Sequence, residues 1–265
     1  MKVTYARAIG DALKEEMRRD EKVIVYGEDV AEFGNIFGVT RGMLEEFGPK
    51  RIRNTPITET AIVGSAIGAA ETGLRPCIEL MYSDFTLVAF SEIFHCVAKW
   101  RYMHGPQYKI PLVIRNASGS SNGAGPEHSN CVESLFMHAP GLTIITPSCP
   151  YDAKGLLKSA IRSDNPVLFC EPKLLYQTKQ EIPDEVYQSD YTIPIGLADI
   201  KRPGKDVTLI AVGLMVPRAL EAAEKLQTEG IDVEVIDPRT IAPLDKDTIY
   251  NSIRKTHRAM VVEES

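Results

Sequence analysis

The sequence is poor in the residues that hold small secreted proteins together or bind zinc. Only five of its 265 residues are cysteines, and no two of them form a C-x-x-C pair. An odd number of scattered cysteines is typical of free thiols in a reducing compartment. The sequence therefore predicts neither a disulfide framework nor a zinc site, and no cluster of aspartates and histidines predicts another metal site.

Long apolar runs and an excess of positive charge are also missing. The apolar stretches fall well short of the ~20 residues that a membrane span needs, and residues 1–22 contain no continuous apolar segment of a secretory signal. The formal net charge of −6 argues against general binding to nucleic acids or anionic membranes. We therefore expect a protein of the cytoplasm or of an organelle matrix, with no nucleic-acid or membrane partner.

Common motifs of nucleotide binding and nucleophilic catalysis are absent as well. The sequence has no G-x-G-x-x-G and no G-K-[ST] pattern, so its glycine-rich loop, 118–130, predicts phosphate binding only weakly. No serine or cysteine has the strand-turn-helix setting of a nucleophile elbow. Carboxylates and histidines are therefore the candidate catalytic residues.

What the sequence does contain is a regular alternation of short apolar runs with amphipathic segments. Apolar residues make up 44% of the chain and charged residues 25%, which is the balance of a globular protein. Strands that alternate with helices predict a parallel sheet covered on both faces, so the fold class is α/β. We expect helices over 5–19, 41–47, 61–72, 85–103, 150–163, 215–229 and 245–255, with strands over 22–27, 75–81, 110–117, 142–148, 165–172, 206–213, 231–240 and 258–265.

A change of composition predicts two domains. The segment 180–196 has two prolines, several acidic residues and no helical period, which indicates a linker. We place the boundary within 178–195 and assign 1–185 to the first domain and 186–265 to the second. Because the last expected strand has no covering helix after it, we expect the second domain to be incomplete.

The segment TPITETAIVGSAIGAAETG is the most informative part of the chain. Thr58 is a plausible helix N-cap, which puts Glu59 in the first turn, where free N–H groups stabilise a carboxylate. Glu59 is either a capping residue on the surface or an acid/base carboxylate that faces a ligand. The small residues of the following helix favour the second interpretation, because they permit close packing.

Three further residues follow expected strands and are candidates for a site at the carboxyl edge of the sheet. Glu28 is either the start of a solvated loop or a site carboxylate. Phe85 is either a core aromatic or a platform for a ligand. His128, in the glycine-rich loop, is either a surface histidine or a proton-transfer group.

Taken together, these segments resemble the β subunit of the thiamine-diphosphate-dependent E1 component of 2-oxo acid dehydrogenase complexes, in the transketolase-like superfamily. The matches run in order along the chain. They are GEDV, VTRG, RIRNTPITE, GAAETGLRPCIELM, EHSN, PYDAKGLLKSAIRSDNPVLFCEPKLLY, IDPRTIAPLD and KTHRAMVVEE.

The resemblance implies a pyrimidine-binding domain followed by a transketolase C-terminal domain, in an α2β2 tetramer. Thiamine diphosphate would bind between subunits, and the α subunit would hold its diphosphate and Mg²⁺ through a GDG…N motif. This sequence has no GDG, which agrees with a β subunit. The lipoyl acyltransferase, E2, would be the second partner.

The resemblance also implies roles for single residues. Glu59 would hydrogen-bond N1′ of the aminopyrimidine, Phe85 would stack on that ring, and Ile57 would contact the cofactor. Glu28 would join a polar path between two active sites, and His128 would lie near the substrate or the lipoyl arm. In some members, main-chain carbonyls bind a potassium ion, and the matching residues are Leu112, Ala160, Ile161, Ser163 and Asn165.

The expected activity is oxidative decarboxylation of a 2-oxo acid, with transfer of the acyl group to lipoyl-E2. AIRSDNPV and NSIRKTHR favour pyruvate, whereas CEPKLLY is also similar to the branched-chain enzyme and PYDAKGLL to the acetoin enzyme. The alternatives are therefore an acetoin or branched-chain dehydrogenase, or a truncated, non-catalytic β subunit that serves in assembly. Asn130 stands where relatives often have glutamine.

Overall fold

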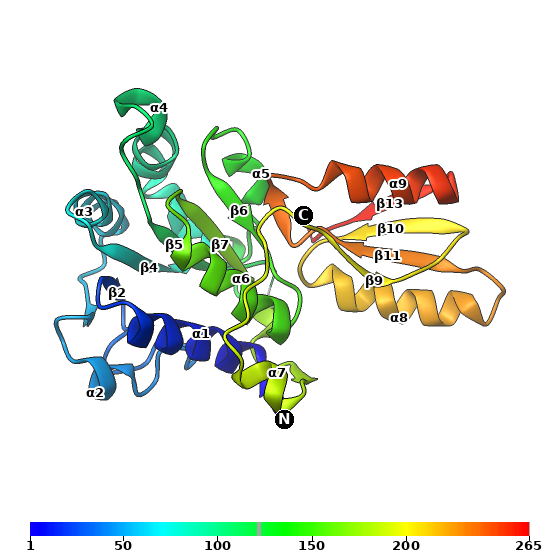
Figure 1. Cartoon of the computed structure of the whole chain (residues 1–265), viewed down its shortest axis with the longest axis horizontal. Coiled ribbons are helices and arrows are strands. Elements are labelled where there is room, and N and C mark those ends of the chain that lie inside the picture. Colours follow the sequence, from blue (N-terminus) through cyan, green and yellow to red (C-terminus); the bar gives the residue numbers. More distant parts are fainter. Residues whose placement is uncertain (121–122, 265) are drawn as a thin grey trace.

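A seven-stranded sheet forms the centre of the larger of two lobes in the computed structural model, which describes residues 1–120 and 123–264 (Figure 1). The strand order is β12-β6-β7-β5-β4-β2-β3, and all neighbours are parallel except β12, which is antiparallel to β6. The strands are β2 (Val23–Gly27), β3 (Ile52–Asn54), β4 (Arg75–Tyr82), β5 (Val113–Ser118), β6 (Thr143–Ile145), β7 (Val167–Pro172) and β12 (Thr240–Ala242).

Helices cover both faces of this sheet (Figure 1). One face packs against α1 (Tyr5–Arg19) and α6 (Pro150–Arg162). The other packs against α3 (Glu59–Glu71), a π-helical segment (Glu92–Val97) and, less closely, α4 (Trp100–His104). The predicted α/β class with a parallel sheet is therefore confirmed.

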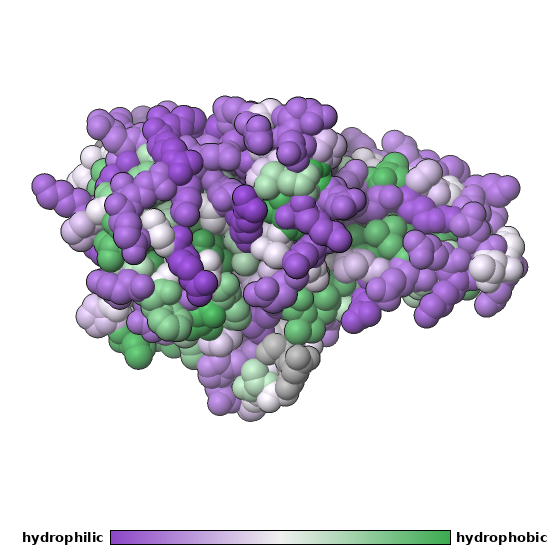
Figure 2. All heavy atoms as spheres, turned by 90° about the horizontal axis from the view of Figure 1, so that it is seen from below, coloured by the Kyte–Doolittle hydropathy of each residue, from purple (hydrophilic) through white to green (hydrophobic). Residues whose placement is uncertain are grey.

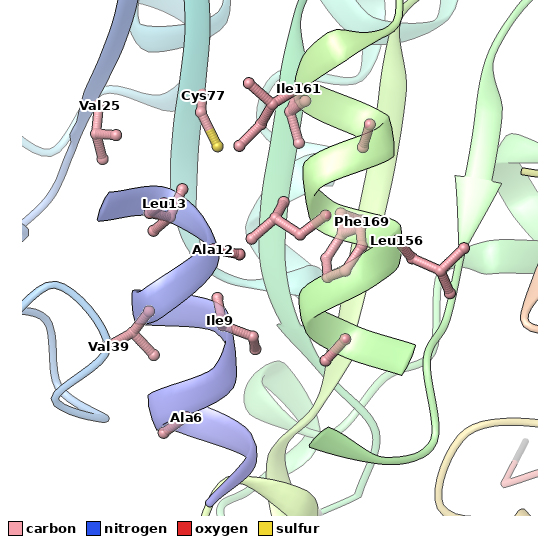
Figure 3. Close-up of a cluster of buried hydrophobic side chains, with 14 of the residues drawn as sticks. Ala6, Ile9, Ala12, Leu13, Val25, Val39, Cys77, Leu156, Ile161 and Phe169 are labelled. Carbon is pink, nitrogen blue, oxygen red and sulfur yellow. The ribbon is translucent and has the colours of Figure 1, made fainter. Parts of the chain in front are cut away.

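The core between the sheet and helices α1 and α6 explains the apolar periodicity predicted for residues 5–19. Ile9 and Leu13, one turn apart on α1, are fully buried, and they belong to one apolar cluster with Leu156 of α6 and Phe169 of β7 (Figure 3). Thr4 caps the start of α1, because its hydroxyl accepts a hydrogen bond from the backbone N–H of Arg7 at 3.2 Å.

The smaller lobe has its own four-stranded sheet in the order β13-β10-β11-β9, in which only β9 is antiparallel. Helices α8 and α9 lie on opposite faces of it (Figure 1). The elements are β9 (Asp199–Arg202), β10 (Val207–Ala211), α8 (Met215–Gln227), β11 (Val233–Asp237), α9 (Lys246–Thr256) and β13 (Ala259–Val262).

Backbone pairing and buried charges join the two lobes. Strand β12 leaves the smaller lobe and extends the sheet of the larger one. Beside it, Asp152 of α6 is fully buried and pairs with Lys201 of β9 and, at 3.2 Å, with Arg239. The lobes are therefore joined by backbone pairing and by buried charges.

The remaining elements are short. They are β1 (Lys2–Thr4), α2 (Met43–Phe47), α5 (Glu133–Phe136), β8 (Lys179–Glu181), α7 (Asp184–Gln188) and the 3₁₀ turns Ser83–Leu87, Pro126–His128 and Lys173–Leu175. The segment predicted to be a linker thus contains β8, which pairs with β1, and α7. Buried Lys154 and Lys158 of α6 anchor it through Tyr187 O at 2.5 Å and Asp190 at 2.6 Å. The exact domain boundary stays a prediction.

The prediction of one long helix over 85–103 is wrong. The chain forms a 3₁₀ turn, then the π-helical segment, and then α4. The 3₁₀ turn is closed by buried polar groups, since Thr86 Oγ1 donates to Ser83 O at 2.6 Å and Ser83 Oγ donates to Asn130 O at 2.5 Å. These side-chain bonds compete with a regular helix.

Gly10 tests the packing of α1. A Cβ at this position would come closer than 3.0 Å to the backbone oxygen of Val39. We predict that Gly10→Ala destabilises the chain by about 1–3 kcal/mol, although helix propensity alone predicts a gain of about 1 kcal/mol. Urea unfolding measures the difference. The matched control is Gly64→Ala on α3, whose Cβ would meet nothing within 4 Å; equal effects of the two changes would contradict the packing argument.

Candidate active site

Four of the predicted site residues, Glu28, Glu59, Phe85 and His128, lie at the carboxyl edge of the larger sheet. Glu28 directly follows β2, and Glu59 begins α3 shortly after β3. Phe85 lies in the 3₁₀ turn that follows β4, and His128 lies in the loop after β5. Because parallel strands end at one edge, four distant segments of the sequence converge there. Ser121 and Asn122 of the predicted glycine-rich loop lie outside the described residues.

Glu59 is the first residue of α3 and is only 6% exposed. Its predicted place in the first helical turn is confirmed. Thr58 occupies the predicted N-cap position, but its side chain makes no capping hydrogen bond. A surface-capping role does not fit a buried carboxylate, and the acid/base role of Glu59 stays a prediction.

Glu28 is a second buried carboxylate at this edge, also 6% exposed, and its Oε1 has no hydrogen-bond partner among the described residues. Burial raises the pKa of Glu28, and the charges of Glu59, Asp29 and Glu79 raise it further. The two predicted carboxylates are therefore brought together electrostatically. A buried oxygen without a partner indicates a site that a ligand completes.

Aromatic rings surround His128. Its ring centroid lies 4.4 Å from that of Tyr82 and 5.4 Å from that of Phe85, both edge to face. Nδ1 of His128 is buried without a hydrogen-bond partner among the described residues. Phe85 and His128 are thus placed together, and a free ring nitrogen is available for proton transfer.

Two residues that the sequence analysis did not single out contribute to this cluster. Lys173, after β7, donates from Nζ to His128 O at 2.8 Å, and burial lowers the pKa of its ammonium group. Asp84, in the turn after β4, is 7% exposed and accepts a hydrogen bond from the Asn130 side chain. The sequence could have pointed to Lys173 and Asp84 only through their positions close after the ends of β7 and β4. Asn130 therefore links its own loop to the turn after β4 through Asp84.

Ile57 differs from the other predicted residues because it is 82% exposed. Nearby in the fold, Val88 is 57% exposed and its carbonyl accepts a hydrogen bond from Thr60 of α3 at 3.1 Å. On the face shown in Figure 2, hydrophobic surface gathers in patches on the larger lobe. The predicted contact of Ile57 with a cofactor stays a prediction.

The carbonyls predicted to bind potassium lie on either side of Arg75. Its Nε donates to Ile161 O at 2.8 Å and its Nη2 to Ser163 O at 2.5 Å. The other three carbonyl oxygens, those of Leu112, Ala160 and Asn165, accept hydrogen bonds from nearby N–H or O–H groups. The Arg75 guanidinium therefore already donates to two of the five oxygens, and potassium binding by this set stays a prediction.

Other classes of site find no support in the described part of the chain. Its histidines, cysteines, aspartates and glutamates form no group of three or more that could ligate a metal ion. None of its helices combines the length and the apolar character needed to cross a bilayer.

Comparison with known proteins identifies both domains. Residues 1–179 match the family model described as the transketolase pyrimidine binding domain, and residues 196–265 match the transketolase C-terminal domain. A solved split gene transketolase in an inactive β4 tetramer has the same fold, with a TM-score of 0.80 over 98% of this chain and 78% of its own, at 24% identity.

Curated relatives define the class more narrowly. The chain is 46% identical to the pyruvate dehydrogenase E1 component subunit beta of Rickettsia felis, over 100% of this chain and 80% of the relative. It is 44% identical to the acetoin:2,6-dichlorophenolindophenol oxidoreductase subunit beta of Bacillus subtilis and 45% identical to the 2-oxoisovalerate dehydrogenase subunit beta of that organism, in each case over 99% of this chain and 79% of the relative.

The chain is therefore an α/β protein of the transketolase-like class, with a pyrimidine-binding and a C-terminal domain. Within that class it belongs to the family of β subunits of 2-oxo acid dehydrogenase E1 components. The predicted family is confirmed, and the chain is a subunit of an enzyme.

Glu28 makes the stability of the chain depend on pH. A carboxylate whose pKa is raised by folding binds more protons in the folded than in the unfolded state, so stability falls as the pH rises from the unfolded value of 4.5 through the folded pKa. We predict that Glu28→Gln removes this fall and is more stable than the wild type at neutral pH, with no difference below both pKa values. Thermal unfolding from pH 4 to 8 measures it; a less stable variant at neutral pH would contradict the assignment.

Proposed function

We propose that the carboxyl edge of the larger sheet binds the aminopyrimidine half of thiamine diphosphate and that the chain acts as the β subunit of a 2-oxo acid dehydrogenase. The observation that carries the proposal is Glu59, a buried carboxylate at a helix N-terminus beside a second buried carboxylate, Glu28. Such a carboxylate can share a proton with a ring nitrogen.

The residues of this chain divide the work. Glu59 hydrogen-bonds N1′ of the aminopyrimidine and holds the proton there, while Phe85 packs against the ring. Glu28, a buried carboxylate on which the charge of Glu59 acts, extends the proton path away from Glu59. When bound, thiamine diphosphate supplies the carbon that adds to the 2-oxo group and accepts the electrons released on decarboxylation.

His128 serves the substrate side of the site. Its unpartnered Nδ1 accepts or donates a proton at the substrate oxygen or at the lipoyl arm of E2. Tyr82 and Phe85 hold the imidazole ring, and the bond from Lys173 to its carbonyl fixes the backbone of the loop. The buried ammonium group of Lys173 also makes this side of the site favourable for an anionic 2-oxo acid.

An α subunit completes the site. The chain has no GDG motif for the diphosphate and Mg²⁺, and Ile57 is left open to a neighbour at 82% exposure. We therefore propose an α2β2 assembly that delivers the acyl group to E2. Potassium binding by the main-chain carbonyls of Leu112, Ala160, Ile161, Ser163 and Asn165 stays part of the proposal.

Pyruvate is the proposed substrate, on the strength of the sequence segments AIRSDNPV and NSIRKTHR. Relatives named for pyruvate, acetoin and 2-oxoisovalerate are almost equally similar, at 44–46% identity, so overall similarity does not separate them. Turnover of the reconstituted αβ pair on pyruvate, branched-chain 2-oxo acids and acetoin decides among the three.

Glu59→Gln tests the proposed function. The amide keeps the shape of the side chain but cannot share the proton, so turnover of the complex with its α subunit should fall by about 10²–10⁴. Exchange of the C2 proton of the bound cofactor, measured by deuterium quench, should fall with it. The matched control is Glu71→Gln, an exposed glutamate at the end of the same helix, which should leave both rates unchanged. Normal exchange in Glu59→Gln would overturn the assignment.

The exposed face of α3 provides a second test, of assembly. Gly64 and Gly68 lie on this face, and a Cβ at either would meet nothing within 4 Å. We predict that Gly68→Leu leaves the stability of the isolated chain almost unchanged but weakens association with another subunit at least about tenfold, through overpacking at the contact. Sedimentation equilibrium measures association. Unchanged association would show that this face is not an interface.

A further inference from the structure

Three buried charged side chains lie side by side on the central strands of the larger sheet. Arg115 of β5, only 1% exposed, lies between Glu79 of β4 and Glu171 of β7, which are 5% and 1% exposed. Its Nε and Nη2 donate to the two oxygens of Glu171 at 2.7 and 2.9 Å, and its Nη1 donates to Glu79 Oε2 at 2.7 Å. One guanidinium serves two carboxylates, so the group retains a net negative charge when both are ionised.

The network continues into the loop that follows Glu28. Asn35 is 2% exposed, and its Nδ2 donates to Glu79 Oε1 at 2.7 Å. Its Oδ1 accepts the backbone N–H groups of Phe37 at 2.7 Å and of Val39 at 3.1 Å. Asn35 also has a left-handed backbone, with φ of 61°. A single amide thus ties the loop 29–39 to a buried carboxylate of the sheet.

The same carboxylate lies directly next to the end of β2. Gly27, the residue before Glu28, is the register partner of Glu79. A Cβ on Gly27 would lie closer than 3.0 Å to the backbone oxygen of Glu79 and 3.2 Å from its Cβ. The charged groups that act on Glu28 are Glu59 of α3, its neighbour Asp29 and this Glu79.

Stability alone does not account for such a cluster. Replacing a buried ion-pair network by apolar residues of similar volume is often neutral or stabilising. This one lies at the edge of the sheet that carries the site, and its members contact both the end of β2 and the loop after it.

We propose that Arg115 and Glu79 are positioning residues of the acid/base site: Arg115 holds Glu79 in place, and Glu79 fixes the loop 29–39 through Asn35 while keeping a negative charge beside Glu28. The proposal rests on the proposed function only in taking Glu28 as part of the site. Neither readout below requires the cofactor, so the proposal fails independently of the Glu59→Gln test.

The first experiment follows the Glu28 carboxyl group in the full chain by ¹³C NMR, with glutamate labelled and Glu28→Gln used for assignment. In Glu79→Gln the Arg115–Glu171 pair remains, and Glu28 should titrate at lower pH than in the wild type, by about half a pH unit or more. The matched control is Glu181→Gln, an exposed glutamate on β8, which should leave the titration unchanged. An unchanged titration in a folded Glu79→Gln chain would overturn the electrostatic part of the proposal.

The second experiment tests the loop. Asn35→Gly retains a residue that adopts positive φ without strain, and it removes the side-chain bonds to Glu79, Phe37 and Val39. The amides of Phe37 and Val39 lose a direct bond and are therefore left out of the readout. Hydrogen exchange of the other amides over 29–39 should become at least about tenfold faster, while exchange in β4 and β5 stays as in the wild type. Wild-type exchange in this loop would overturn the positioning role, and equally faster exchange in the strands would show that the change acts on the whole fold.

Discussion

The parallel alignment of β2, β3, β4 and β5 is the constraint on which the site depends. It brings the ends of four separate strands to one edge, and with them Glu28, Glu59, Phe85 and His128. The same alignment removes several carboxylates from water at that edge, where burial and neighbouring negative charges raise the pKa of Glu28. The parallel alignment therefore both assembles the site residues and places their carboxylates in a buried, unfavourable environment.

The two faces of this sheet are covered differently. On one face, α1 and α6 contact each other closely and seal a core of apolar side chains (Figure 3). On the other, α3 buries Ile62, Val63 and Ala66 against the sheet but leaves Gly64 and Gly68 exposed. A helix that is apolar or small on most sides is typical of one buried between two layers. The second layer is expected from another subunit.

Much of this fold could be predicted from local pattern. The four-residue period of Ile9, Leu13 and Met17 predicts α1, and the β-branched run before Gly27 predicts β2. Glu59 could be placed because Thr-Pro before it forces an extended approach to a helix start. In each case the signal lies within a few residues of the element that it predicts.

What could not be predicted depends on contacts between distant segments. Arg115 stands in an apolar strand with no local sign of its partners, which lie 36 and 56 residues away on β4 and β7. Strand β12 is three residues long and joins a sheet whose other strands all come from the first 172 residues. The 3₁₀ turn that overlaps the start of the predicted helix over 85–103 is bonded to a distant segment, from Ser83 to Asn130. Sequence periodicity predicts none of these three features, because each depends on contacts between distant segments.

The second lobe also contacts the loop at the site edge. Ser120, at the start of the loop that carries His128, donates from its backbone N–H and its hydroxyl to Glu264 Oε1 at 2.9 and 3.0 Å. The charge of Glu264 also acts on Lys173, which donates to the backbone of His128. The loop of His128 is thus held from the sheet by Lys173 and from the smaller lobe by Glu264.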